Sequence, residues 1–298
     1  MGKAQSAMEY LMTYGWAILI IAVVLGALYY LGIFNSATTA PRAQPGSCKV
    51  VRPSGPGTTT FVNLAGVCTG QLPMFVSSFT GVNSLGSGGA YIDAGNSGLL
   101  DMKTNDFTIS LWVNLPSALA CAGTCTVVGH GSQGNIGYKF QISAADKLVP
   151  TLTDINSNVW TQQNTNAIAA GAWAQIAIIV FRSTNIVNYY INGVLDYSSS
   201  TTLSTNSISN PSTHLYIGTA QAPAFRSYNG LISNVQIYNT SLSAIEMQGL
   251  YVEGIGGAPT RPQNLVGWWP LNGDSNDYSG NGNNGASTNV IFTNTWTR

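Results

Sequence analysis

A stretch without a single charged residue, from Leu11 to Phe34, limits what this chain can fold into more than any other feature. As a helix, its 24 residues extend about 36 Å, enough to cross a hydrocarbon core of about 30 Å. Aromatic residues such as Trp16 and Tyr30 lie toward its two ends, as is typical of membrane interfaces. The sequence therefore predicts a transmembrane helix over residues 5–34, with the N-terminus inside and the body outside.

The residues before this stretch have an unusual order. A small residue, Ala4, is followed by QSAMEYL, which brings a glutamate, Glu9, to the start of the apolar run. A secretory signal has its small-residue cleavage site after the apolar core, whereas here the small residue precedes it. An unpaired carboxylate near lipid is costly, so Glu9 marks a place where a partner is expected.

This segment resembles the leader of archaeal type IV pilin-like proteins, in which a prepilin peptidase cuts just before the glutamine. The resemblance implies a leader peptide over residues 1–4 and a mature N-terminus at Gln5. It also implies that the Glu9 carboxylate pairs with the terminal amine of a neighbouring subunit in a filament. The alternative is a plain membrane anchor in which Glu9 reaches water.

Composition favours an extracellular body. Only 7% of the residues are charged, and Lys+Arg equals Asp+Glu at 11 each, so no basic surface for nucleic acid is expected. A Pro- and Gly-containing linker over residues 35–47 follows the helix, and residues 48–80 read as a small β segment bounded by cysteines. We assign the remaining residues, 81–298, to one β-sandwich.

The four cysteines predict disulfides, as an even number in an exported, loop-rich chain usually does. Cys121 and Cys125, in CAGTC, are close enough to bridge one tight loop, which leaves Cys48 and Cys68 for the second bond. A four-thiolate zinc site is the alternative, although the spacings are not those of paired C-x-x-C motifs.

The body has the pattern of an all-β domain. FTISLWV, at 107–113, alternates in polarity, and AQIAIIVF, at 174–181, is apolar on both faces like a buried central strand. Asn192-Gly193 supplies the pair of positive φ angles that a type I′ hairpin turn needs. Only SLSAIEMQGLY looks helical, beginning at a Ser cap.

These pieces resemble the laminin-G-like, concanavalin A-like lectin/glucanase superfamily, whose fold is an antiparallel jelly-roll sandwich. The resemblance lies in YIDAGNSGLLDMKTNDFTISLWVN, the YYINGVL hairpin, LYIG, YNGLISNVQIYNTSLSAIEMQGLY and LVGWWPLNGDSNDYSGNGNNG. The last piece normally comes first in such domains. Because only 13 residues follow it here, too few for a second sandwich, we predict a circularly permuted domain whose C-terminal strand completes the sandwich.

The same resemblance bears on function. Glucanases of the superfamily carry paired glutamates on one strand, whereas this body contains only Glu246 and Glu253, beside the predicted helix. We therefore predict a non-enzymatic domain that binds a glycan or a cell-surface protein. Trp160, in an Asn-rich stretch, is the aromatic residue that we expect on a binding rim.

Calcium is the cofactor that the resemblance implies. Asp277 matches an acid that often binds Ca²⁺ near a D-x-S-G-N-G turn, and Asn281 could add an oxygen ligand. The second acid usual in a late strand is replaced by Ser233 and Asn234. A turn in which Asp277 bonds its own backbone is the alternative.

Together these features predict a pilin-like structural or adhesive protein at the cell surface, displaying a lectin-like domain. A monomeric, membrane-anchored carbohydrate-binding module is the main alternative, and a glycan-degrading enzyme is a remote one. Asn239, in the sequon NTS, is a candidate glycosylation site.

Overall fold

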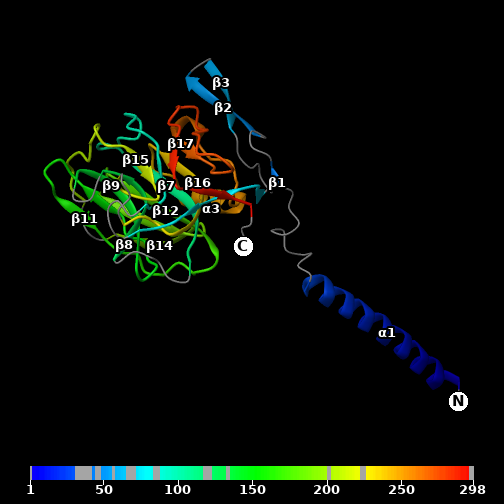
Figure 1. Cartoon of the computed structure of the whole chain (residues 1–298). Coiled ribbons are helices and arrows are strands. Elements are labelled where there is room, and N and C mark those ends of the chain that lie inside the picture. The colour runs from blue at the N-terminus through cyan, green and yellow to red at the C-terminus, as the bar shows by residue number, and fades with distance from the viewer. Residues whose placement is uncertain are drawn as a thin grey trace. The chain divides into compact units, whose positions relative to one another are not determined.

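The computed structural model (Figure 1) describes most of the chain in two compact units, Met1–Pro41 and Arg42–Arg298, which we treat separately. For part of the N-terminal region it describes the backbone alone. The described residues are 2–30, 42–43, 48–55, 58–64, 72–82, 88–116, 123–131, 135–199, 203–221 and 226–294.

The first unit contains one helix, α1 (Gly2–Tyr30). Its apolar side chains from Tyr14 to Leu25 are exposed. They are distributed around the whole circumference of the helix, which has no polar stripe. A helix of this kind needs an apolar environment or a partner on every side.

The predicted membrane span over residues 5–34 differs from what the structure describes. Among the residues described, no helix is both long and apolar enough to cross a membrane. The observed helix begins earlier than predicted, at Gly2, and takes in Lys3, while residues 31–34 lie outside the described residues.

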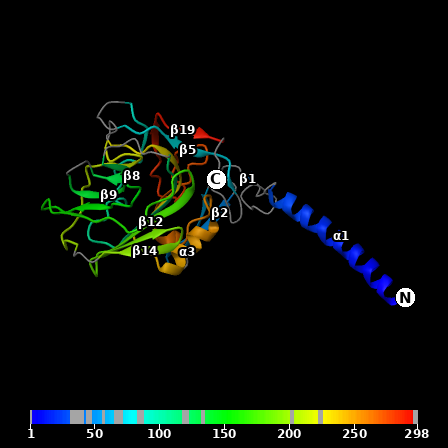
Figure 2. The same cartoon turned by 90° about the horizontal axis from the view of Figure 1, so that it is seen from below.

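The second unit is an antiparallel sandwich of two sheets, as predicted (Figures 1 and 2). In the described residues the first sheet has seven strands, and the second has eight. The first consists, in spatial order, of β11 (Val159–Thr161), β10 (Thr151–Thr153), β9 (Gly137–Ser143), β8 (Thr124–His130), β15 (Leu215–Ile217), β6 (Tyr91–Asp93) and β18 (Ala286–Thr288). The second consists of β14 (Val194–Ser198), β13 (Ile186–Ile191), β12 (Trp173–Phe181), β7 (Phe107–Asn114), β16 (Gly230–Tyr238), β5 (Val76–Phe79) and β19 (Ile291–Thr293), with β17 (Leu265–Trp269) also paired to β16.

The main core lies between the sheets and follows the sequence pattern. The alternate residues of β7 from Phe107 to Val113 are fully buried in it, as predicted for one face of that strand. Asn192 and Gly193 take φ angles of 53° and 75°, which confirms the turn between β13 and β14.

A second apolar cluster covers the outer face of the eight-stranded sheet. The helix α3 (Ala244–Glu253) places Met247 and Leu250 there, against Trp268 of β17. Figure 2 shows α3 lying beside β14. Ser243 caps this helix in a reciprocal capping box with Glu246, which confirms the predicted helix start. The central strands of this sheet, β12, β7 and β16, are therefore buried on both faces.

The C-terminal segment completes the sandwich, as the permutation hypothesis requires. β17, which carries the GWW sequence, pairs with β16 in the sheet that also contains β7. Farther along, β18 pairs with β6 and β19 with β5, so the last strands extend both sheets. A short 3₁₀ helix, η1 (Pro262–Asn264), connects α3 to β17.

The segment predicted as residues 48–80 divides differently in the structure. β2 (Cys48–Gly55) and β3 (Thr58–Leu64) form a separate hairpin that lies against η1. β1 (Arg42–Ala43), inside the predicted linker, pairs in parallel with β4 (Leu72–Pro73). β5, however, belongs to the sandwich, because it pairs with β16 and β19 and buries Val76 and Phe79. The sandwich therefore begins before residue 81.

His130, the last residue of β8, is a buried titratable group in this core. It is 1% exposed and its ring stacks on Tyr138, with ring centroids 5.3 Å apart. Neither ring nitrogen has a hydrogen-bond partner among the described residues. Burial lowers the pKa of His130, and the nearby Asp101 carboxylate, which raises it, does not compensate.

We predict that His130 makes the domain less stable in acid. A pKa lowered by folding means that the unfolded chain binds the proton first, so stability is complete above pH about 6.5 and falls below it, by up to about 1.4 kcal/mol per pH unit. His130→Phe keeps an aromatic ring but cannot titrate. Urea unfolding at several pH values should give a shallower acid slope for the variant, and equal slopes would contradict this assignment.

Candidate functional site

On the outer face of the seven-stranded sheet, polar and aromatic side chains of β6 and β15 lie together and are partly exposed. On β6, Ile92 points into the core, so Tyr91 and Asp93 point outward. On β15, Leu215 and Ile217 enter the core, so Tyr216 also points outward. Because β6 and β15 are neighbours in register, these residues share one patch.

We name the residues Tyr91, Asp93, His214 and Tyr216 the Tyr–His cluster. His214 Nδ1 lies 2.8 Å from Asp93 Oδ1 and 2.9 Å from Oδ2, and the Gly95 amide also donates to Oδ1. The His214 ring stacks on Tyr216 at 6.0 Å, and Tyr91 meets Tyr216 edge to face at 6.0 Å. Tyr216 therefore lies between two rings, beside a carboxylate.

The cluster is reachable from solvent. The side chains of His214 and Asp93 are 41% and 27% exposed, and both tyrosines are partly exposed. Burial, assisted by Asp93 and Tyr91, raises the pKa of Tyr216, so its hydroxyl keeps its proton at neutral pH. Among the described residues, neither tyrosine hydroxyl nor His214 Nε2 has a hydrogen-bond partner. The cluster thus presents unused hydrogen-bonding groups next to aromatic rings.

A chain segment bounds the cluster on one side. Gly129 of β8 pairs with Tyr216, and a Cβ atom at Gly129 would lie 2.9 Å from Ala220 Cα and 3.1 Å from the Thr219 oxygen. Residues 219–220 therefore cross directly over β8. We name this crossing the 219–220 ridge, and it can form only because Gly129 has no side chain.

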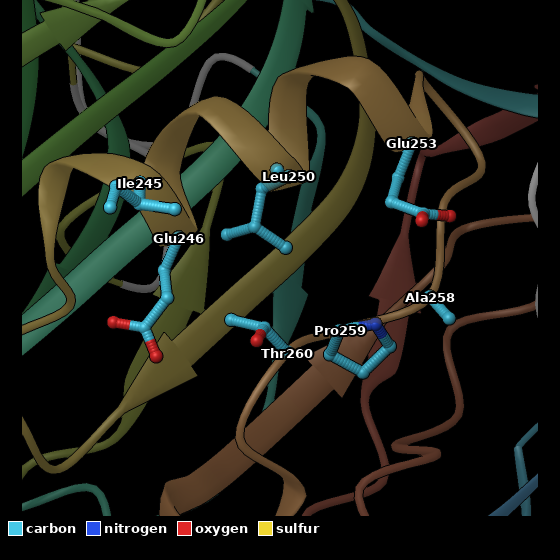
Figure 3. Close-up of a pocket in the computed structure, with 8 residues that line it drawn as sticks. Ile245, Glu246, Leu250, Glu253, Ala258, Pro259 and Thr260 are labelled. Carbon is cyan, nitrogen blue, oxygen red and sulfur yellow. The ribbon is translucent and has the colours of Figure 1, made fainter.

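A pocket of about 410 Å³ lies on the other side of the sandwich, between α3 and residues 258–260. Figure 3 shows Leu250 pointing from α3 toward Pro259 and Thr260, with Glu246 and Glu253 toward the two ends. The Glu246 carboxylate is already used by the helix cap and by an ion pair with Arg261. None of the described residues that line this pocket is aromatic, so they offer no platform for stacking a ring.

The expectation that Trp160 lies on a rim is wrong. Trp160 is 9% exposed and belongs to the main core. β11 alternates exposed, buried, exposed, and Trp160 is its central residue, so the strand turns the indole inward while Val159 and Thr161 face water.

Asp277 stabilises a turn by hydrogen bonds. Its Oδ1 accepts from the backbone amides of Trp268 and Ser279, and its Oδ2 accepts from that of Asn283, each at 2.9 Å. The side-chain amide of Asn281 donates to the carbonyls of Leu265 and Val266. These groups face hydrogen donors and carbonyls, so the arrangement does not fit a shared calcium ion.

The two residues that replace the usual second acid, Ser233 and Asn234, are also engaged in hydrogen bonds. Ser233 donates to the Pro270 carbonyl, and Asn234 Oδ1 accepts from Trp268 Nε1 at 2.6 Å. Among the described residues, no group of three or more His, Cys, Asp or Glu side chains could hold a metal ion. Calcium binding by the domain is not tested and stays a prediction.

The remaining predicted residues are only partly visible. Cys125 is disulfide-bonded, but Cys121 and Cys68 lie outside the described residues, and for Cys48 only the backbone is described. Both pairings therefore stay predictions. Asn239 is exposed directly after β16 and accepts a hydrogen bond from Asn264, and its glycosylation is untested. The side chains of Ala4, Gln5 and Glu9 lie outside the described part of α1.

Sequence reasoning missed the Tyr–His cluster. Its signals are two short alternations, Y-I-D at 91–93 and H-L-Y at 214–216, each with one apolar residue between two polar or aromatic ones. Each alternation predicts an outward-facing pair on its own strand. Nothing in the sequence says that the two strands are neighbours or that their outer face stays exposed.

Comparisons with known proteins agree with this architecture. Residues 86–248, more than half of the chain, match the family described as Concanavalin A-like lectin/glucanases superfamily. No curated protein matches the chain. A proposed carbohydrate-binding protein from Bacteroides ovatus has a similar structure, with a TM-score of 0.55 and 16% identity; the match covers 75% of this chain and 60% of that protein.

Other solved structures are similar at lower scores. A heptameric SAP-like pentraxin from Limulus polyphemus has a TM-score of 0.49 at 11% identity, covering 74% of this chain and 96% of its own. The CBM40 of Ruminococcus gnavus IT-sialidase, solved with α2,3-sialyllactose, has a TM-score of 0.47 at 13% identity, covering 60% and 100%. At such identities the structural likeness concerns the fold alone.

We predict that Asp277→Ala lowers the free energy of unfolding by about 3 kcal/mol, because it removes the acceptor of three backbone amides. Thermal unfolding measures the loss. Since the turn is closed by hydrogen bonds, the wild-type melting temperature should be the same in calcium and in chelator. A marked drop in chelator would instead assign the turn to calcium.

Proposed function

The chain belongs to the concanavalin A-like lectin/glucanases superfamily, and from this premise we propose that its sandwich binds carbohydrate, through the Tyr–His cluster, at the outside of the cell. The observation that carries the proposal is the composition of the cluster. Aromatic rings can stack on the apolar face of a sugar, while nearby carboxylate, imidazole and hydroxyl groups can bond to its hydroxyls.

The arrangement favours binding over hydrolysis. A glycosidase needs two carboxyl groups on either side of one sugar bond. The Tyr–His cluster contains a single carboxylate, Asp93, and that group is bonded to His214 and to the Gly95 amide. The similarity to a proposed carbohydrate-binding protein supports the same conclusion.

We predict that the full chain binds at least one member of a panel of immobilised glycans and that Tyr216→Ala weakens this binding about tenfold, the effect of losing one aromatic contact. Tyr251→Ala is the matched control, because Tyr251 is a partly exposed tyrosine on α3, over the other sheet. The chain should be prepared in a detergent without a sugar headgroup. Absence of binding to every glycan would refute the function.

The N-terminal unit suggests how the domain is displayed. We propose that it acts as a pilin-like segment that a prepilin peptidase cuts before Gln5 and that packs against copies of itself. The support is the QSAMEYL sequence together with the exposed apolar side chains of α1. Packing among copies would bury these side chains and would give Glu9 a cationic partner.

We predict a mature N-terminus at Gln5, to be checked by mass spectrometry of the native protein. Glu9→Ala should fold normally and reach the cell surface but give little sheared filament, because one partner of a buried charge pair is lost. Leu11→Ala, two residues away, is the control for a neutral change in the same region. An intact Met1, or normal filament yield from Glu9→Ala, would leave a monomeric anchor as the better explanation.

A further inference from the structure

We infer that the Tyr–His cluster recognises an uncharged sugar at the free end of a glycan. This inference rests on the proposed function, and it narrows the ligand in two ways. The charges of the cluster select against acidic sugars, and the 219–220 ridge selects for a chain end over an internal segment.

The first argument concerns charge. Asp93 is the one carboxylate of the cluster, and His214 is its partner. The cluster contains no Lys or Arg side chain. It therefore supplies no fixed cation for an acidic sugar, and a sialic or uronic acid placed beside Asp93 would meet a like charge.

The second argument concerns hydrogen bonding. Both Asp93 oxygens accept from His214 Nδ1, so that nitrogen carries the hydrogen and Nε2 of a neutral ring is an acceptor. A carboxylate oxygen has about two acceptor sites, so Asp93 Oδ2 keeps one for a ligand. The cluster therefore offers acceptors at Asp93 and His214 and adaptable hydroxyls at both tyrosines. Neighbouring hydroxyl groups of a neutral sugar supply the matching donors.

The third argument concerns the ridge. Strands β18, β6 and β15 lie side by side, and the ridge stands over the next strand, β8. With about 4.8 Å between strands, the distance from β18 to the ridge is about 14 Å. Thr219 and Ala220 are buried, so this wall is packed against the sheet. A sugar stacked on Tyr216 therefore meets the wall, and a glycan cannot continue in that direction.

Among the described residues, none covers the opposite side of the cluster, at β18. In the register between β6 and β18, Ala286 is paired with Asp93 and Thr288 with Tyr91, and the three residues of β18 are exposed. Their side chains are small, and β18 is the edge strand of the sheet. The rest of a glycan can therefore leave over β18 while its end unit lies against the ridge.

The experiment compares matched ligands on the full chain. Neutral oligosaccharides ending in glucose, galactose or mannose are immobilised beside the same cores ending in sialic or uronic acid. We expect binding to a neutral series and at least about tenfold weaker binding to its acidic counterpart. Asp93→Asn keeps the side-chain volume but removes the charge, so it should weaken neutral binding and reduce the discrimination against acid. Tyr251→Ala is again the control, and melting temperatures confirm that each variant is folded.

A second comparison tests the chain end. Free monosaccharide or disaccharide of the bound type should compete, and chemical capping of the terminal sugar should abolish binding. Equal binding to capped polymer, or preference for the acidic series, would overturn this inference and leave carbohydrate binding intact. Neutral binding that Tyr216→Ala and Asp93→Asn both leave unchanged would also overturn it, because the site would lie elsewhere. Absence of all glycan binding would refute the proposed function itself.

Discussion

The sandwich depends on how one edge of β16 is divided between two strands. Residues Gly230–Ile232 of β16 pair with β5, and Val235–Tyr238 pair with β17. The change of partner falls at Asn234, where φ is 52° and the register against β7 also shifts. The Asn234 side chain holds this junction by accepting from Trp268 and Gln236 and donating to the Gly257 carbonyl. These hydrogen bonds stabilise the point at which β17 takes the place of β5 along β16.

This junction also determines which sheet is covered by a helix on its outer face. Because β17 is held beside β16, Trp268 and α3 cover the outer face of the eight-stranded sheet with a second apolar cluster. The seven-stranded sheet has no corresponding helix among the described residues, and the 219–220 ridge crosses part of it.

Local sequence signals predicted local structure well. The alternation in β7, the Asn192-Gly193 turn and the Ser243 cap each depend on neighbouring residues, and the structure confirms them. The sandwich fold and the place of β17 were also predictable, from the resemblance and its unusual order. Trp160 was misplaced because an Asn-rich neighbourhood says nothing about which face of an edge strand is buried. The Tyr–His cluster could not be found because its halves are more than 100 residues apart, and their pairing depends on long-range sheet order.

The parallel pair of β1 and β4 has a mechanical consequence. It joins Arg42 to Leu72 and Ala43 to Pro73, and so closes a loop that contains the β2–β3 hairpin. A pull on the N-terminal end of the chain crosses this two-residue ladder before it reaches β5, which is held on both sides by β16 and β19. The ladder has only two residue pairs, so it opens first, and with the predicted Cys48–Cys68 bond in place it releases about 35 Å of chain. A load applied through this end therefore lengthens the chain before it reaches the strands of the sandwich.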